Sequence, residues 1–371
     1  MEIFGQTPAQ VILFFVLYGV TGAVPFIAAL YLLLRRGNAF APDITPPLRL
    51  RRWAASLFAA VTLSHVWWLL LYIFSRDINP MAYVLVVMLD CVTLLTTIAG
   101  TLLSMLQDRR RPVWPVLVAM IPFVALWGVL MVYPDDRFKQ IASAYVLFLF
   151  VLFTVYMVFA VRRYGRWLND NYADLENKKV WLSQTVTLGC LLLFILYAIA
   201  DISFTLLIFL MHLTEFVLFG LLLWRVDTLS SLTPKSLTAN GDAFGKGLDV
   251  EAVNIDLAQI ERLLAEHCVA TQLYLQHDLT SQQLAHAIGT NRFYLSQYFS
   301  RQGITYNTYI NNLRINHFIS RYQEAAAAGR PIIAQQLASD SGYRSYSTFS
   351  LAFKQRTGQS VTAWMHDTTQ L

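Results

Sequence analysis

The chain of 371 residues is 56% hydrophobic and only 14% charged, and its mean hydropathy is +0.47. This composition excludes an ordinary soluble protein. The net charge of +5 belongs to residues 1–226, which hold 17 Lys/Arg against 12 Asp/Glu, whereas residues 227–371 hold 11 of each. The three cysteines are scattered and form no pair motif, which suggests neither a disulfide framework nor a zinc site.

Long apolar runs fill the first 226 residues, and each approaches the roughly 20 residues that a membrane-spanning helix needs. Seven runs meet this criterion: 9–34, 53–74, 81–106, 113–133, 141–161, 180–200 and 202–224. A single helix over 180–224 would be about 67 Å long against a hydrocarbon core of about 30 Å, so two passes with a turn at Ala200–Asp201 fit better. The N-terminal MEIFGQTPAQ has no Lys or Arg, and we therefore expect a retained membrane helix rather than a signal peptide.

The charges between the runs predict the orientation of the helices. Thirteen cations fall in the alternate loops 35–52, 107–112 and 162–179, and only three lie in the other loops. Cytoplasmic loops carry the excess of Lys and Arg, so the N-terminus is expected outside and everything after the seventh pass inside. Residues 1–226 are thus predicted to be a seven-pass transmembrane domain.

Four ionisable residues fall near the middle of the predicted helices: His65, Asp90, His212 and Glu215. Such residues are costly in a bilayer and often functional, so a signal-binding or proton-sensing site is one interpretation. The other interpretation is that they are neutral or paired and hold helices together. No spacing among them fixes the geometry of a metal site.

Residues 227–250 are rich in Ser, Thr, Gly and other small residues and predict a flexible linker. The following residues, 251–371, show short helical patterns. A helix capped at Thr280 or Ser281 buries Leu284, Ala285 and Ile288, and a very short turn leads into NRFYLSQYFSRQ. This succession is the outline of a helix-turn-helix.

The outline then recurs after a long helix from about Tyr306 to Ala328. Ile332, Ile333 and Leu337 are expected in one helix, and SYSTFSLAFKQRTG forms the next, with Phe349 and Phe353 facing inward. Eight cations between residues 291 and 356 are opposed by two acidic residues, which concentrates positive charge where DNA phosphates would lie. The eight are Arg292, Arg301, Arg314, Arg321, Arg330, Arg344, Lys354 and Arg356.

The segment GYRSYSTFSLAFKQRTGQSVTAW resembles the second helix-turn-helix of the AraC-type transcriptional regulators. LTSQQLAHAIGTNRFYLSQYF resembles the first unit, and YINNLRINHF resembles the helix that joins the two. The resemblance covers roughly residues 255–365. It implies an all-helical domain whose two recognition helices enter successive major grooves of DNA.

The resemblance also implies which side chains contact DNA. Bases would be reached by Phe293, Ser296 and Gln297 in the first unit and by Tyr346, Ser347, Ser350 and Leu351 in the second. Arg292, Arg344 and Lys354 are the adjoining cations that we expect at the DNA surface. Leu351 stands where the family often has Arg, and Val361 where it often has Pro, so the second unit is expected to read bases weakly or through thymine methyl groups.

The sequence therefore predicts an all-α protein with a seven-helix transmembrane bundle and a cytoplasmic double helix-turn-helix domain. We expect a membrane-bound one-component transcriptional regulator in a bacterial plasma (inner) membrane. Its partners would be double-stranded DNA, the lipid bilayer, a signal ligand of unidentified chemistry and, as an open alternative, a second copy of the chain. No catalytic constellation and no cofactor are expected. The competing interpretation is a transporter or receptor whose cytoplasmic helical domain serves protein interaction.

Overall fold

The computed structural model describes residues 8–35, 38–42, 44–74, 80–133, 135–199, 204–232 and 257–369. The chain divides into two compact units, and each unit is made of two separate segments of the chain. The membrane unit contains residues 1–164 and 180–233, and the C-terminal unit contains residues 165–179 and 234–371. The connection between the fifth and sixth helices is thus part of the C-terminal unit.

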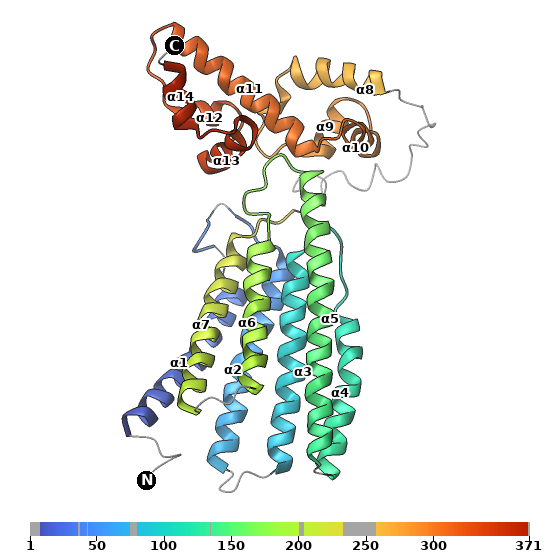
Figure 1. Ribbon diagram of the computed structural model, residues 1–371, viewed down its shortest axis with the longest axis vertical. Helices are drawn as coiled ribbons and strands as arrows, with labels where there is room; N and C mark the ends of the chain where they lie inside the picture. The colour runs from blue at the N-terminus through green and yellow to red at the C-terminus, as the bar shows by residue number, and fades with distance from the viewer. Residues whose placement is uncertain are drawn as a thin grey trace. The chain divides into compact units, whose positions relative to one another are not determined.

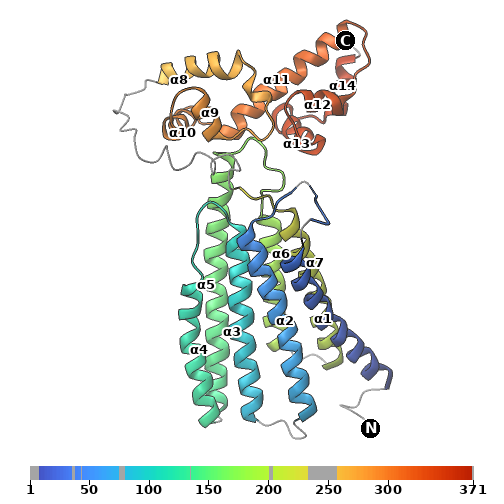
Figure 2. The same cartoon turned by 180° about the vertical axis from the view of Figure 1, so that it is seen from behind.

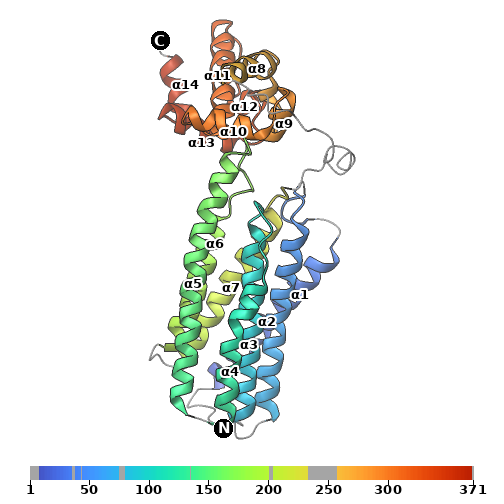
Figure 3. The same cartoon turned by 90° about the vertical axis from the view of Figure 1, so that its right-hand side faces the viewer.

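Seven helices lie side by side in the described part of the membrane unit (Figures 1, 2 and 3). They are α1 Pro8–Leu34, α2 Leu48–Phe74, α3 Pro80–Met105, α4 Trp114–Val132, α5 Asp136–Asn169, α6 Trp181–Ile199 and α7 Phe204–Thr228. Six of these contain segments long and apolar enough to cross a membrane, and α6 has a shorter apolar segment, Trp181–Tyr197. The most apolar windows of the six are only 11% to 39% buried within the protein. Most of their apolar side chains face outward, as expected for helices surrounded by lipid.

The predicted apolar runs lie in these helices, but α2 and α5 extend into segments that were expected as loops. Helix α2 begins at Leu48 and includes Arg49, Arg51 and Arg52. Helix α5 includes Arg137 and Lys139 at its start and continues through Arg162, Arg163 and Arg166 to Asn169. A helix satisfies its own backbone hydrogen bonds, so α5 need not end where its side chains become charged. The turn predicted at Ala200–Asp201 lies outside the described residues, and so do residues 233–250 of the predicted linker. The predicted start of the linker at residue 227 is wrong, because Asp227 and Thr228 belong to α7 and are buried.

The C-terminal unit is built on α11, Tyr306–Ala327, with shorter helices grouped along it (Figures 1 and 2). The first group holds α8 Leu257–Leu264, a π-helical turn Ala265–Val269, a 3-10 turn Leu273–Leu275, α9 Ser281–Ala287 and α10 Arg292–Arg301. The second group holds α12 Ala334–Asp340, α13 Tyr346–Thr357 and α14 Val361–Thr369. The predicted sequence of two helix-turn-helix units and a joining helix is therefore present.

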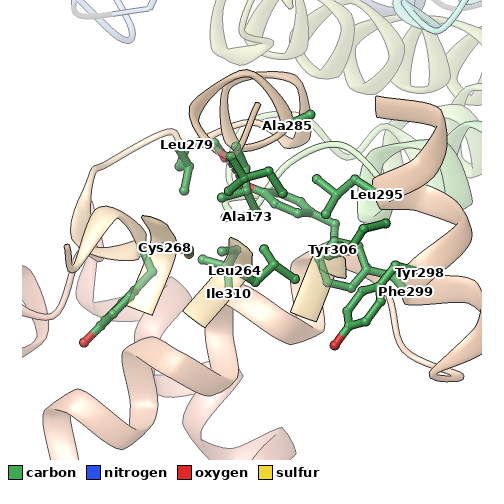
Figure 4. Packing of buried hydrophobic residues seen from close by; sticks show 14 residues of the cluster. Ala173, Leu264, Cys268, Leu279, Ala285, Leu295, Tyr298, Phe299, Tyr306 and Ile310 are labelled. Carbon is green, nitrogen blue, oxygen red and sulfur yellow. Dashed lines mark hydrogen bonds between the residues drawn. The ribbon is translucent and has the colours of Figure 1, made fainter. Parts of the chain in front are cut away.

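Each half of α11 serves a separate hydrophobic core. The first core gathers Leu264, Cys268, Leu284, Leu295, Phe299 and Ile310, and Figure 4 shows part of it. The second gathers Ile315, Phe318, Phe349, Phe353 and Val361. The expected core positions of α9, α10 and α13 are buried in these clusters, because their spacing of three or four residues places them on one helix face.

The expectation for Ile332 and Ile333 is wrong. Helix α12 begins at Ala334, and Ile333 is its N-cap in an extended conformation with 64% of its surface exposed. Pro331 lacks the backbone N–H that a helix interior requires, and the chain becomes helical only three residues later.

Candidate DNA-binding surface

Helix α10 presents one buried side and one polar side. Its N-cap is Asn291, whose side-chain oxygen accepts a hydrogen bond from the Tyr294 amide at 3.0 Å. Leu295, Tyr298 and Phe299 face the first core. The outward side carries the residues that the sequence predicts to contact DNA, and all of them are exposed: Arg292, Phe293, Ser296 and Gln297.

Phe293 is the most unusual residue on this side of α10. Its ring is 70% exposed and lies 5.7 Å from the ring of Tyr294. A large apolar ring gains little free energy from such a position in the protein itself. It is available for stacking or for contact with a thymine methyl group in a major groove.

Helix α13 is organised in the same way around two phenylalanines, Phe349 and Phe353, which are fully buried. The Ser345 hydroxyl caps the helix by accepting a hydrogen bond from the Thr348 amide at 3.3 Å. Ser347, Leu351 and Lys354 share the exposed side, at spacings of four and three residues.

The remaining residues of the second unit that were predicted to contact DNA differ in exposure. Ser350 is half-buried, and so is Tyr346, whose ring lies 5.7 Å from Phe349 and packs against the second core. Arg344 is exposed, and its guanidinium donates to the Asp278 carboxylate at 3.2 Å. Leu351 has 53% of its surface exposed, which leaves room for a longer side chain.

One of the eight cations counted in the sequence is too buried to contact DNA. Arg314 is 1% exposed, and its guanidinium donates to the carbonyl oxygens of Tyr274 and Gln276, both at 2.7 Å. Its Cζ also lies 5.5 Å from the centre of the Tyr343 ring. Arg314 therefore joins the two helix-turn-helix units internally, and the charge available at the surface is smaller than the sequence count.

In the membrane unit the four predicted ionisable residues come from three helices, and side chains of α1 and α2 surround them. His65 on α2 has its Nε2 3.1 Å from the Thr21 hydroxyl, and it lies within electrostatic range of Asp90 and His212. Asp90 on α3 accepts hydrogen bonds from the indole N–H groups of Trp67, at 2.7 Å, and Trp68.

The α7 residues of this polar cluster approach α1. The ring of His212 lies edge-on to Phe14, with centroids 6.3 Å apart. The Tyr18 hydroxyl is within electrostatic range of both Asp90 and Glu215. The buried Glu215 Oε2 atom has no hydrogen-bond partner among the described residues, an arrangement that costs free energy inside a protein. Among the described residues, no group of three or more His, Cys, Asp or Glu side chains has the arrangement of a metal site.

The connection 165–179 contains polar residues whose role the sequence did not predict, since only its cations were counted, as markers of topology. Asn171, Asp174 and Lys178 are buried against the C-terminal unit, and Glu176 accepts hydrogen bonds from hydroxyls at the start of α13. No apolar periodicity marks this segment. The only signal in the sequence is a cluster of Asn, Asp and Glu, which is also typical of an ordinary loop.

Residues 284–367 match the family model of a helix-turn-helix domain. The match runs from α9 to α14 and so includes both units and both candidate recognition helices. The C-terminal unit thus carries a DNA-binding helix-turn-helix domain of the AraC type, as the residues indicated. Comparisons with curated proteins and with solved structures found no match. The chain therefore combines a DNA-binding domain of transcription regulators with a set of membrane-spanning helices.

Proposed function

We propose that the protein is a membrane-bound one-component transcriptional regulator. Its C-terminal unit would bind a specific DNA sequence from the cytoplasmic side of a bacterial plasma membrane, and its seven helices would sense the signal. The charge distribution between the helices supports this orientation. The observation that carries the proposal is the pair of helices, α10 and α13, that each turn a polar, basic side outward.

The exposed side chains suit different parts of the DNA. Arg292, Arg344 and Lys354 would contact phosphates, which provide affinity without sequence information. Ser296, Gln297 and Ser347 carry hydrogen-bonding groups that can read base edges in the major groove. Phe293 and Leu351 would contact thymine methyl groups, so a preference for A·T pairs is expected at those positions.

The test is selection of duplexes from a random DNA pool by the full-length protein in lipid nanodiscs. We expect a motif with two half-sites about one helical turn, roughly 34 Å, apart. The double variant Phe293→Ala, Ser347→Ala should lose the motif, whereas Val269→Ala, which shortens an exposed apolar side chain elsewhere in the unit, should retain it. Binding without an enriched motif would contradict sequence-specific regulation.

For the signal, we propose the polar cluster around His65, Asp90, His212 and Glu215. The buried Glu215 oxygen, which has no partner in the described part of the chain, supports this choice, since a ligand carrying a hydrogen-bond donor would satisfy it. A regulator carrying Asp90→Asn or Glu215→Gln would still bind DNA but would lose or lock its transcriptional response. Loss of solute transport with unchanged transcription would instead favour the transporter interpretation.

A further inference from the structure

The segment Gly165–Lys179, which we call the strap, lies between α5 and α6 in the chain but belongs to the C-terminal unit. Its middle is built into the first core. Ala173 is 1% exposed, and Figure 4 shows it among the residues of that core. The Asn171 carbonyl accepts a hydrogen bond from the Ser281 amide at 3.0 Å, and Tyr172 forms an antiparallel bridge with Thr280. These contacts fix the strap to the start of α9.

Helix α11 holds the same part of the strap from another side. The Asn307 side-chain amide donates to the carbonyl oxygens of Tyr172 and Ala173, at 3.1 and 2.6 Å. The Asp174 carboxylate lies within electrostatic range of the buried Arg314 guanidinium. Buried backbone groups with partners and a buried apolar side chain make this middle part, residues 171–174, a firm anchor.

The following residues of the strap reach the second helix-turn-helix unit. Lys178 pairs at 3.4 Å with Asp278, just before α9, and Asp278 also pairs with Arg344 of the second unit. The Glu176 carboxylate accepts hydrogen bonds from the hydroxyls of Ser345 and Thr348, the latter at 3.0 Å. Ser345 is the N-cap of α13, so a negatively charged group of the chain itself is seated on the N-terminus of the second recognition helix.

A second acidic residue of the strap lies near the first recognition helix. Burial raises the pKa of the Asp170 carboxyl, and the positive charges of Arg292 and Arg166 oppose this effect. Asp170 is therefore close enough to Arg292, at the start of α10, to interact with its charge. The strap thus brings one carboxylate toward the N-terminal end of each candidate recognition helix.

Recognition helices enter the major groove with their N-terminal residues first, and helix N-termini are favourable positions for phosphates because backbone N–H groups and the helix dipole point there. Hydroxyls of Ser and Thr at such a position are typical phosphate ligands. Ser345 and Thr348 have this arrangement, and the oxygen that they hold is supplied by Glu176.

We infer that the N-terminus of α13 is a DNA-phosphate site and that Glu176 fills it in the DNA-free protein. The inference rests on the proposed function. DNA then has to displace one side chain, while the anchor at residues 171–174 stays in place. The anchor separates Glu176 from α5, but the strap continues from Glu176 directly into α6, so a displacement of α6 would move Glu176 onto or off the site.

The test compares DNA affinity of the full-length protein in nanodiscs with that of Glu176→Gln, which removes the charge and keeps the size of the side chain. We use a random-sequence duplex of about 40 bp, roughly four helical turns, so that phosphate contacts dominate. The variant should bind about fivefold more tightly, because Gln keeps an oxygen that accepts the hydrogen bonds and removes only the charge, and a partly exposed charge contributes at most about that factor. Glu266→Gln is the matched control, since Glu266 is an exposed carboxylate of the same unit.

The outcomes separate the two proposals. Equal gains for Glu176→Gln and Glu266→Gln would overturn the phosphate site, because only the net charge would then matter. Absence of DNA binding by all three proteins would overturn the proposed function and this inference together.

Amide hydrogen exchange gives a second, independent measurement. Added duplex should increase exchange at residues 175–178 of the strap and leave residues 171–174 protected. Unchanged protection of 175–178 in a saturated DNA complex would show that Glu176 does not leave, and this inference would be wrong.

Discussion

At the scale of single residues, Gly342 and Gly358 provide a matched pair. Both have positive φ angles, +89° and +79°. A Cβ at Gly342 would lie 2.8 Å from the backbone oxygen of Leu275, whereas a Cβ at Gly358 would meet nothing within 4 Å. The first glycine therefore serves both a backbone conformation and a close approach of two segments, and the second serves the conformation alone.

This difference predicts unequal costs of substitution. Gly358→Ala should lower the free energy of unfolding of the C-terminal unit by about 1 kcal/mol, the usual cost of a left-handed alanine. Gly342→Ala should cost about 2–4 kcal/mol, because the backbone of Leu275 has to move as well. Amide exchange of α13 in the full-length protein measures both values. Equal costs would mean that the segments do not approach as closely as described.

The burial of Cys268 leads to a second prediction for a single residue, which concerns the reactivity of its thiol. Burial raises the pKa of this thiol to about 11, because the thiolate is poorly solvated in the first core. The group is therefore neutral at pH 8, with about one thiolate in a thousand, whereas an ordinary cysteine is substantially ionised there.

Iodoacetamide should accordingly leave Cys268 unmodified in the folded protein at pH 8 and alkylate it rapidly in denaturant. Mass spectrometry of the peptide containing Cys268 distinguishes it from Cys91 and Cys190. Rapid alkylation without denaturant would contradict the burial of this part of the core.

At the scale of elements, the helices with regular apolar spacing could be predicted and those that depend on distant partners could not. The spacing of Leu295 and Phe299 and that of Phe349 and Phe353 indicated α10 and α13, because a helix brings residues four apart onto one side. The predicted start of α12 was wrong, because the apolar Ile333 is an exposed N-cap and not part of the helix. The candidate DNA-contacting residues were selected by resemblance, and their contacts with DNA stay predictions.

The role of the strap could not be predicted from the sequence, and the reason is physical. Its partners are Thr280, Asn307 and Ser345, more than a hundred positions further along the chain. Local periodicity reports only which side of an element is apolar, and this segment has no period. The topology rule used only its cations, and the acidic residues Asp170, Asp174 and Glu176 had no predicted role.

The exposed side of α13 indicates a substitution that should strengthen DNA binding by the second unit. Leu351 is exposed on the same side as Ser347 and Lys354, and Leu351→Arg would supply a side chain able to bind guanine or a phosphate. We expect about tenfold tighter binding, and a plot of log affinity against log salt that is steeper by about one. Titration of the selected motif at several salt concentrations measures both.

Gln302→Arg adds the same charge at an exposed position at the end of α10 and serves as the control. It should change the affinity much less than Leu351→Arg. If the two variants gained equally, Leu351 would lie outside the DNA interface.

At the scale of the whole molecule, the chain passes between the two units three times, after residues 164, 179 and 233. If the predicted linker at the last crossing were the sole connection, signalling through pairing of DNA-binding domains would be favoured, because a flexible coil of about 20 residues transmits no force over its span of roughly 25 Å. The strap adds two connections, from α5 and to α6, and the second allows a displacement of α6 to reach Glu176.

Signalling through the linker and signalling through the strap should respond differently when residues are inserted into each connection. Six Gly/Ser residues inserted after residue 236 would lengthen a flexible linker by only about a tenth in root-mean-square span, so we expect wild-type output from a reporter carrying the selected motif. The same insertion after Lys179 would separate the strap from α6, and basal output should shift toward that of Glu176→Gln. Because both insertions add identical residues to a protein that keeps all its DNA-contacting side chains, a larger effect at residue 236 would favour the linker and the pairing of domains as the route of the signal.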